Sequence, residues 1–406
     1  MSLIVLADGS VRPEVLADPY ALYAKLRAQT PAVFDSGVNA WLVSRYDDVR
    51  GLALDERLRA RRSQSYVRAL APGERARFEL FRRTRDAMIL FLDGPTHTRV
   101  RRAVAGAVHA SVAALGPALV KRHVAALVDR IATSPGEIDL VRDLAEPLPR
   151  LVLSGLLGLP LSEEATTLYR QSLAFNSSFG GAITIRRVEA AERALRELRP
   201  PMLAIATDPA PGSILASLRT AVDAGELTED ELVASAVALV AAGHETTTHL
   251  VANTFVALAG NPAAQALAGS SDAAARSVVD EVLRFEPSIQ LTAREAGQDL
   301  EVAGQTIRRG DRVLLLLASA NRDPARFDRP DSFEPGRADR LSALSFGIGP
   351  HRCPGSGLAR TQAEIALRAL LDAVGSIRLA EEPIWKDSFT FRGPVALPAH
   401  AGSGCL

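Results

Sequence analysis

The chain contains very little cysteine, with only Cys353 and Cys405 among its 406 residues. Two thiols, one of them next to the C-terminus, exclude a scaffold held together by several disulfides. A cysteine-rich zinc or iron–sulfur centre is excluded as well, because such centres use several thiolates each. Any chemistry at sulfur therefore depends on a single thiol in the body of the chain.

Charge of one sign is not in excess either, since 47 basic and 47 acidic side chains give a formal net charge of zero. This balance leaves no overall electrostatic footprint for nucleic acid. The segment before Asp8 is too short, and lacks the basic residues, to be a signal peptide. We also expect no membrane anchor before the rest of the chain. We therefore expect a cytoplasmic, monomeric protein that binds neither nucleic acid nor membrane.

Helical periodicity dominates the chain up to Ala293, and from there the pattern changes to short strands with glycine turns. The balance predicts a mainly α fold with small β-sheets, and the lack of a clear linker favours one large domain over residues 1–406. We expect helices over 46–54, 96–134, 143–175 with a break near 160, 185–206 and 355–373, and strands at 41–44 and beyond 293.

One long helix is predicted with particular clarity. Thr228 and Glu231 form the capping-box pattern, and the helix continues to Ala259, about 45 Å at 1.5 Å per residue. Between Leu232 and Ala259 the only charged side chain is Glu245. The apolar run before it is too short to cross a membrane. The polar segment around Glu245 is either a kink in a buried helix or a functional site.

Cys353 lies in a loop rich in glycine, directly before a predicted helix. Pro354 suits the first helical position, so we expect the sulfur near unsatisfied backbone N–H groups, which favour a thiolate. Glycines in the loop let backbone approach a flat, bulky group. A thiolate held in this way is a good axial ligand for haem iron, whereas a buried structural cysteine is the simpler alternative.

The loop resembles the haem-binding loop of the cytochrome P450 family of haem-thiolate monooxygenases. The matching pattern is Phe346-Gly347-x-Gly349-x-His351-x-Cys353-x-Gly355, followed by Leu358-Ala359-Arg360. The resemblance implies the P450 fold, with the long helix over the haem face opposite the thiolate. It also implies haem b as cofactor, Cys353 as iron ligand, and Phe346, Gly347 and Gly355 beside it.

The segment Ala242-Gly243-His244-Glu245-Thr246 is similar to the oxygen-activation motif of the same family. Ala242 and Gly243 lack bulk, which leaves room for dioxygen against the helix backbone. Thr246 can hydrogen-bond dioxygen and Glu245 can relay protons from water, an acid–alcohol route for proton delivery.

His97 and Arg101 are four residues apart and share one helix face, an arrangement that suits carboxylates. An exposed basic helix end is the alternative, and it is the default for Arg99 and Arg102. The resemblance implies that the haem propionates bind four donors, a number that suits four carboxylate oxygens. These are His97, Arg101, Arg294 and His351.

Glu281 and Arg284 are neighbours on one helix face, a pattern that is weak by itself. The pattern lies about seventy residues before the cysteine loop, a spacing that matches the family. The resemblance then implies a network of Glu281, Arg284 and Arg337. We expect this network to serve structure and haem retention.

The chain carries no flavin or nicotinamide fingerprint, so the resemblance implies electrons from a separate ferredoxin or flavodoxin with its reductase. An acidic carrier could dock on Arg99, Arg102, Arg352 and Arg360, although solvated surface charge explains any single one equally well. The expected reaction inserts oxygen from O2 into an apolar small molecule by hydroxylation, epoxidation or coupling. Rival functions are a haem-thiolate peroxygenase, isomerase or dehydratase, and a non-enzymatic haem sensor or carrier. Segments implied to line the substrate pocket are 82–92, 175–183, 237–242, 288–292 and 388–392.

Overall fold

The computed structural model describes residues 2–6, 8–60, 76–133, 137–160, 163–176 and 185–402. They form two compact units. Unit 1 comprises Met1–Leu58, Val120–Pro149 and Glu245–Leu406, and unit 2 comprises Arg59–Leu119 and Arg150–His244. Three helices run from one unit into the other. The predicted single domain over residues 1–406 remains a prediction.

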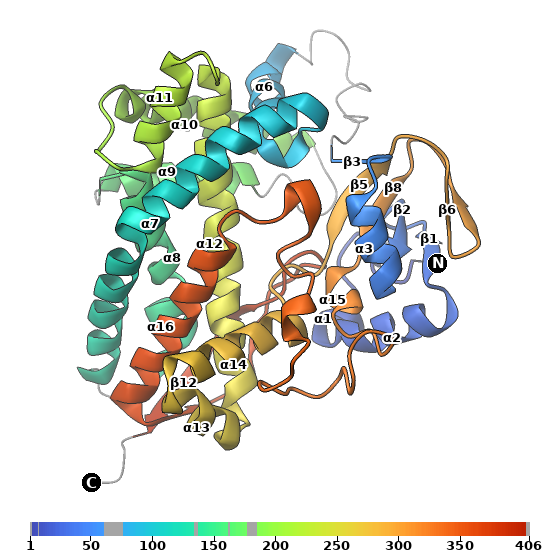
Figure 1. The fold of residues 1–406 in the computed structure, drawn as a ribbon, viewed down its shortest axis with the longest axis vertical. Helices are drawn as coiled ribbons and strands as arrows, with labels where there is room; N and C mark the ends of the chain where they lie inside the picture. The colour runs from blue at the N-terminus through green and yellow to red at the C-terminus, as the bar shows by residue number, and fades with distance from the viewer. Residues whose placement is uncertain are drawn as a thin grey trace. The chain divides into compact units, whose positions relative to one another are not determined.

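Helices dominate both units, as predicted, and the strands form small sheets (Figure 1). The helices are α1 (Pro13–Ala17), α2 (Pro19–Gln29), α3 (Tyr46–Leu54), α6 (Glu79–Ala87), α7 (Gly94–Thr133), α8 (Pro147–Leu157), α9 (Glu163–Asn176), α10 (Ile185–Thr207), α11 (Ile214–Asp223), α12 (Glu229–Ala259), α13 (Pro262–Ser270), α14 (Asp272–Phe285), α15 (Leu317–Ala320) and α16 (Ser356–Val374). Short 3-10 turns are η1 (Ile89–Phe91), η4 (Arg340–Ser342) and η5 (Gly349–His351), and a π-helical turn, η2, covers Val141–Ala145.

The largest sheet has the strand order β1-β2-β8-β5-β3. β1 and β2 pair antiparallel, β2 and β8 parallel, and β8 and β5 antiparallel. Its strands are β1 (Ala32–Asp35), β2 (Ala40–Val43), β3 (Leu58–Arg59), β5 (Thr292–Ala296) and β8 (Arg312–Leu315). The smaller sheets contain β4 (Ile138–Asp139), β12 (Pro398–Gly402) and β9 (Ser376–Leu379); β6 (Leu300–Val302) and β7 (Gln305–Ile307); and β10 (Ile384–Trp385) and β11 (Pro394–Ala396).

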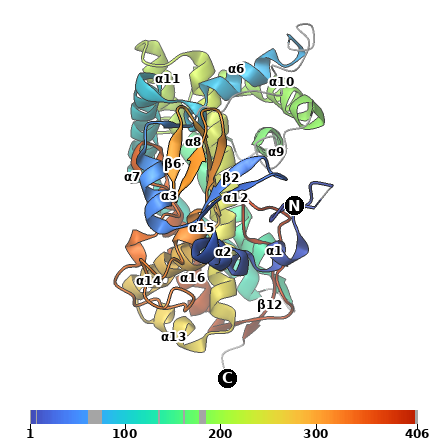
Figure 2. The same ribbon diagram turned by 90° about the vertical axis from the view of Figure 1, so that its right-hand side faces the viewer.

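Both faces of the large sheet are covered at β2 and β8, so these two strands are largely apolar on both sides. Successive strand residues point to opposite faces. Leu42 and Leu314 share one apolar cluster with Tyr23 of α2, whereas Val43 and Val313 share another with α3. Figure 2 shows α3 alongside the sheet. This packing accounts for the continuous run of apolar residues in Ala40–Val43.

Unit 2 is built around the pairing of α9 with α10, which also contacts α6. Phe81 of α6 meets Phe175 of α9 edge to face, with ring centroids 5.8 Å apart. The backbone N–H of Phe81 donates to the carboxylate of Glu192, 2.7 Å away on α10. Phe175 lies in the last turn of α9, which ends one residue beyond the helical stretch predicted over 143–175. Residues 177–183 of the segment expected to line a substrate pocket, including Phe179, lie outside the described residues.

The predicted capping box of α12 is confirmed. The Thr228 hydroxyl accepts from the N–H of Glu231 at 3.2 Å, and the Glu231 carboxylate accepts from the N–H of Thr228 at 2.9 Å. The helix ends at Ala259, and Asn261 caps the next helix through its side chain. The 31 residues of α12 carry Glu245 near their middle.

One helix of the described residues, α7, is long and apolar enough to cross a membrane by length and composition. Pro117 lies within it. Only 33% of its most apolar window is buried, but one such helix is weak evidence for a membrane span. The expected lack of a membrane partner therefore remains a prediction.

Candidate active site

Cys353 of unit 1 is half-buried in the loop between η5 and α16. Its backbone N–H donates to the carbonyl oxygen of Phe346 at 2.8 Å, which closes the loop into a tight bend. Gly347 and Gly349 have φ of +67° and +69°, the left-handed region that favours glycine. A methyl group on Gly349 would lie 2.6 Å from Leu54 Cδ2. Glycine at these positions is thus required by the bend itself.

The prediction that Pro354 occupies the first helical position is wrong. Helix α16 begins at Ser356, with Gly355 as its N-cap. The hydrogen bond from Cys353 to Phe346 holds the preceding residues in the bend, so 354 and 355 form a turn before the helix starts. A methyl group on Gly355 would lie 3.9 Å from the cysteine sulfur. The sulfur therefore lies near the N-terminus of α16, and Cys353 precedes the first residue of that helix by three positions.

Phe346 is held from one side by Arg360 of α16. The guanidinium carbon of Arg360 lies 4.6 Å from the centre of the Phe346 ring, and its Nε lies 2.6 Å from Oδ1 of Asp280. Arg360 is thus engaged by a ring and a carboxylate within its own unit. Its position fits the support of the cysteine loop better than the docking of an electron carrier.

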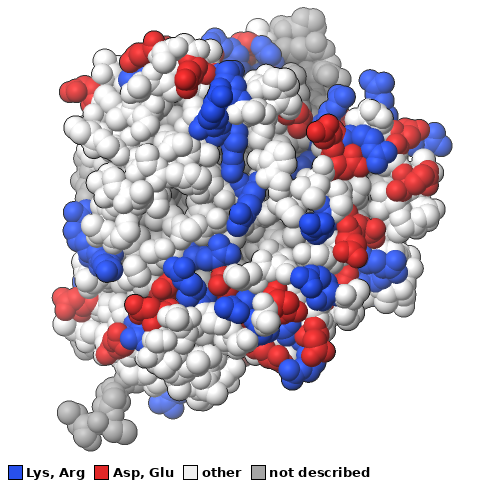
Figure 3. All heavy atoms as spheres, in the orientation of Figure 1, with Lys and Arg blue, Asp and Glu red and all other residues white. Residues whose placement is uncertain are grey.

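Around α14, basic and acidic side chains are interleaved on the face drawn in Figure 3. Arg276 lies 2.9 Å from Glu364, and Arg368 lies 3.7 Å from Asp272. Paired charges of this kind do not make a patch of one sign.

Arg99 of α7 is likewise engaged, because its Nη2 lies 2.6 Å from Oε1 of Glu231 and its Nη1 donates to Oε2 at 2.9 Å. These hydrogen bonds raise the pKa of Arg99. Burial by itself would raise the pKa of Glu231, but hydrogen bonds from Arg99 and from the Thr228 amide outweigh it and lower that pKa. Of the four arginines considered for docking, Arg102 and Arg352 are the exposed ones.

The predicted acid–alcohol pair belongs to the middle of α12, in unit 1. Glu245 has 19% of its side chain exposed, and its Oε1 lies 2.7 Å from Nζ of Lys386. Thr246 is half-buried. Lys386 was not predicted to lie here, and its one distinguishing feature in the sequence is that it is among only three lysines in the chain.

Ala242 and Gly243 fall in unit 2, where Ala242 is exposed and Gly243 half-buried. A methyl group on Gly243 would lie 3.0 Å from Leu153 Cδ1 of α8. Close packing of α12 against α8 therefore explains glycine at 243 without reference to dioxygen, and its predicted role toward dioxygen remains a prediction.

The four donors predicted for propionates are divided equally between the units. His97 and Arg101 lie on α7 in unit 2, and the His97 side chain is buried. Arg294 lies on β5 in unit 1, where its Nη1 donates to the Thr292 hydroxyl at 2.9 Å, and His351 ends η5. Their joint action on two carboxylates remains a prediction.

The expected network of Glu281, Arg284 and Arg337 is present in unit 1. Arg284 Nη2 lies 2.7 Å from Glu281 Oε1, and Arg337 Nε lies 3.2 Å from the same oxygen. The network ties α14 to the segment that leads into the cysteine loop.

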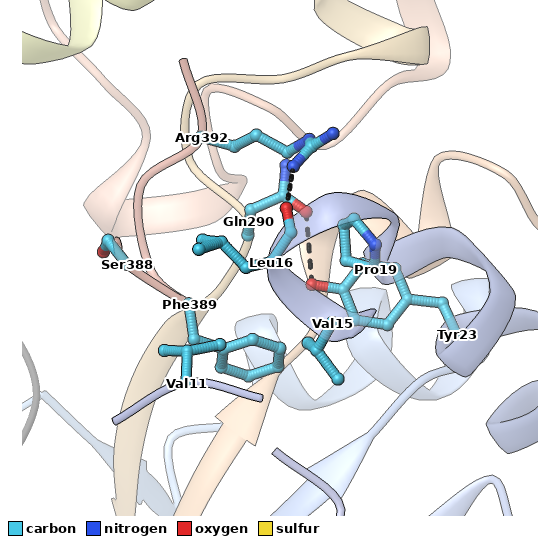
Figure 4. Close-up of a pocket in the computed structure, with 9 residues that line it drawn as sticks. All are labelled: Val11, Val15, Leu16, Pro19, Tyr23, Gln290, Ser388, Phe389 and Arg392. Atoms are coloured by element: carbon cyan, nitrogen blue, oxygen red, sulfur yellow. Dashed lines mark hydrogen bonds between the residues drawn. The ribbon is translucent and has the colours of Figure 1, made fainter. Parts of the chain in front are cut away.

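A small cavity of about 10 Å³ adjoins the segment 388–392, which we expected to line a substrate pocket (Figure 4). Its volume holds about one water molecule, so it is not a substrate site. Tyr23 donates to Gln290 Oε1 at 3.1 Å beside it. The lining residues are Val11, Val15, Leu16, Pro19, Tyr23, Gln290, Ser388, Phe389 and Arg392.

The donor set around Cys353 restricts the metal that it can bind. Among the described residues, no three His, Cys, Asp or Glu side chains are grouped as a metal site. An ion bound by the lone thiol must therefore bring its other ligands with it. Iron in a porphyrin does so, since the four ring nitrogens leave the axial position for one protein ligand. The residues present fit a haem.

Comparison with known proteins gives the family. A family model described as Cytochrome P450 matches residues 275–373. The biotin biosynthesis cytochrome P450 of Bacillus subtilis (strain 168) is 30% identical over 97% of this chain and 99% of its own length. Cytochrome P450 monooxygenase PikC of Streptomyces venezuelae is 34% identical over 97% of this chain and 94% of its own. The chain belongs to the cytochrome P450 family.

Solved structures agree with this assignment. The epothilone B-bound cytochrome P450epoK superimposes with a TM-score of 0.87 at 30% identity, over 97% of this chain and 99% of that one. P450BioI, solved in complex with a hexadec-9Z-enoic acid ligated acyl carrier protein, gives 0.86 at 28% identity, over 96% and 100%. The predicted P450 fold is confirmed, and the relatives identify this P450 as a monooxygenase-type enzyme with a haem cofactor.

Proposed function

We propose that this P450 is a haem b monooxygenase in which the Cys353 thiolate would hold the haem iron. The observation that carries the proposal is the bend around Cys353, with its bond to the Phe346 carbonyl and two left-handed glycines. Such a bend presents the sulfur beside backbone that carries little bulk. When bound, the haem supplies activation of O2 with two external electrons, favoured by the thiolate ligand.

The protein's part is to hold the cofactor and to exclude competing chemistry. Phe346, Gly347 and Gly355 would contact the haem beside the sulfur, and the Arg360 guanidinium lies against the Phe346 ring. His97, Arg101, Arg294 and His351 donate to the propionates. Charge-assisted hydrogen bonds to carboxylates are among the stronger ones, so four such donors retain the cofactor and set its orientation. Ala242 and Gly243 carry little side-chain bulk, so in this proposal they leave room for dioxygen beside α12.

Proton delivery falls to Glu245 and Thr246. The Glu245 carboxylate takes up a proton from water at the partly exposed side of α12, and the Thr246 hydroxyl passes it on at Oγ1. An acid next to an alcohol suits a reaction that consumes protons at a site shielded from bulk water. This pair favours a monooxygenase over a peroxygenase, isomerase or dehydratase.

The proposed substrate is an apolar small molecule of moderate size, which is hydroxylated, epoxidised or coupled. Support comes from relatives such as the epothilone C/D epoxidase of Sorangium cellulosum, 32% identical, and the mycinamicin VIII C21 methyl hydroxylase of Micromonospora griseorubida, 30% identical. The neighbour solved with an acyl carrier protein makes a carrier-bound acyl chain a further ligand to test.

The electrons come, in this proposal, from a ferredoxin or flavodoxin with its reductase. An electron donor of this kind suits a cytoplasmic enzyme. We further propose that the enzyme acts as a monomer and that residues 1–406 form one domain. Arg102 and Arg352 are the arginines whose exposure suits contact with an acidic carrier.

The test is turnover under isotopically labelled dioxygen, with a surrogate ferredoxin and reductase and a library of apolar compounds preselected by haem spin shift. A monooxygenase yields a product with one labelled oxygen atom and requires both oxygen and electrons. Product formation without oxygen would instead indicate an isomerase or dehydratase. Equally efficient turnover with peroxide alone would indicate a peroxygenase.

A further inference from the structure

The carboxylate of Glu245 is met by a lysine from a distant part of the chain. Lys386 Nζ lies 2.7 Å from Glu245 Oε1, with 37% and 19% of the two side chains exposed. Glu245 is the one charged side chain between Leu232 and Ala259, and Lys386 is one of three lysines. The other two, Lys25 and Lys121, are exposed. Lys386 directly follows β10, in the hairpin that joins β10 to β11.

The hairpin is fixed to the face of α12 that carries Glu245. Glu245, His249 and Asn253 follow at intervals of four residues, so they share that face. Asn253 Nδ2 donates to the carbonyl oxygen of Arg392 at 3.0 Å. A methyl group on Gly393 would lie 2.4 Å from two ring carbons of His249, so hairpin backbone and helix side chain are in direct contact.

The backbone of Lys386 is fixed within the hairpin as well. Its N–H donates to the carbonyl oxygen of Gly393 at 3.1 Å. The neighbouring Trp385 ring lies 3.9 Å from the guanidinium carbon of Arg392, whose Nε is 2.8 Å from Glu286 Oε1. Because the start of the lysine side chain is held, its ammonium group can reach only a small region, and Glu245 lies in it.

We propose that Lys386 is a positioning residue for Glu245, rather than only a clasp for the hairpin. The ion pair selects one orientation of a flexible glutamate, so that the carboxylate stays at the partly exposed edge of α12, where water can reach it. The two remaining ammonium N–H groups can hold that water. Segment 388–392 lies two residues after Lys386 in the same hairpin. A ligand that contacts this segment would therefore shift Lys386 and alter its ion pair with Glu245. This inference rests on the proposed proton-delivery role of Glu245.

The test compares haem-loaded Lys386→Met, Lys386→Arg, Glu245→Gln and the double variant Lys386→Met/Glu245→Gln with the wild type. Lys25→Met, the same change at an exposed lysine, is the matched control. The first measurement is hydrogen exchange in peptides that cover 384–396. The second is peroxide released per NADPH oxidised, without added substrate, driven by a plant-type ferredoxin and its reductase.

We expect Lys386→Met to speed hydrogen exchange and to raise the peroxide yield, each by about two- to fivefold, the factor that corresponds to loss of a partly exposed ion pair. Lys386→Arg should retain wild-type values, and Lys25→Met should change neither. The double variant should release no more peroxide than Glu245→Gln alone, since lysine acts through the acid.

Three results would overturn the inference. Unchanged hydrogen exchange in Lys386→Met would mean that the ion pair does not hold the hairpin in solution. Faster exchange with an unchanged peroxide yield, while Glu245→Gln raises that yield, would reduce Lys386 to a structural clasp. If Glu245→Gln itself leaves the yield unchanged, the proposed role of Glu245 fails, and the inference fails with it.

Discussion

The carboxylate of Glu281 and the guanidinium of Arg284 form a two-bond ion pair with neither side chain exposed to solvent. The two bonds measure 2.7 and 2.9 Å. Arg284 also donates to the carbonyl oxygens of Asn321 and Pro330, at 3.1 and 2.7 Å. The N–H of Glu334 donates to Glu281 at 2.9 Å. Every component of the pair thus has partners, as a buried charge requires.

Replacing Glu281 with alanine should strand Arg284 as a buried, uncompensated charge. The expected cost is about 3–5 kcal/mol, a large part of the stability of a typical domain. We expect mainly haem-free or insoluble protein, measured as the ratio of haem to protein after purification. Asp331→Asn is the control, because that carboxylate is 68% exposed where it meets Arg322. Normal haem content in Glu281→Ala would contradict the structural role.

Replacing Gly393 with alanine should push the C-terminal hairpin away from α12. The added methyl group meets the His249 ring, and also His249 Cβ at 2.6 Å, which leaves that side chain little room to turn aside. Overpacking of this kind costs about 1–3 kcal/mol, to be measured as a lower midpoint of chemical unfolding.

The same substitution at Gly51 of α3 provides the control for Gly393→Ala. A methyl group there meets nothing within 4 Å, so alanine should be neutral or stabilise the helix by up to about 1 kcal/mol. The double variant Gly393→Ala/His249→Ala should recover part of the lost stability. A Gly393→Ala protein as stable as the wild type would show that the hairpin does not pack on α12.

Replacing Arg99 with methionine should weaken the N-terminus of α12 in a pH-dependent way. The pKa of Glu231 is lowered in the folded protein, so its ionised form adds stability above the unfolded value of about 4.3. That stability is lost as the pH falls through the lower folded pKa. We expect Arg99→Met to reduce stability by about 1 kcal/mol at neutral pH.

The deficit of Arg99→Met should shrink toward zero as the pH falls through the lowered folded pKa of Glu231, because the carboxyl group is then protonated in both proteins. Thermal unfolding of wild type and variant across this range measures it. Arg102→Met, an exposed change on the same helix, should lack the trend. A deficit that is independent of pH would mean that Arg99 acts through packing alone.

Replacing Thr246 with alanine should uncouple electron use from product formation. Without the hydroxyl, proton delivery fails and we expect peroxide release to rise by up to about a hundredfold, the lower end of the range for general acid catalysis. Peroxide and product are measured per NADPH oxidised, with a compound chosen by spin shift. A dehydratase or isomerase would show no such change.

Local patterns in the sequence were sufficient for much of the fold. The capping box of Thr228 and Glu231 spans four residues, and the structure contains both of its hydrogen bonds. Helix α11 was missed, although Ser213 caps it through a side-chain bond to the N–H of Ala216. The sequence contains the capping residue, but the helix is short and lies between glycine-containing turns, so its periodicity was too brief to identify it.

Contacts between distant segments were not predictable in the same way. Glu281 and Arg284 are one turn apart, so their pairing could be predicted from the spacing. The contact with Arg337 was predicted only from the family resemblance. Lys386 and Glu245 meet because a C-terminal hairpin folds back on α12. Nothing local to either residue specifies that return. The prediction for Pro354 was wrong for a related reason. The hydrogen bond from the Cys353 N–H to the Phe346 carbonyl oxygen closes the loop, and this contact overrides the preference of proline for the first helical position.

The central claim is that the Cys353 thiolate binds the haem iron. Its most direct test is the absorption spectrum of the reduced protein under carbon monoxide. The proposed ligation predicts the red-shifted Soret band of a thiolate complex in the wild type, and its loss in Cys353→Ser. A wild-type spectrum without that band, in protein that contains its full complement of haem, would contradict the assignment of Cys353 and the mechanism built on it.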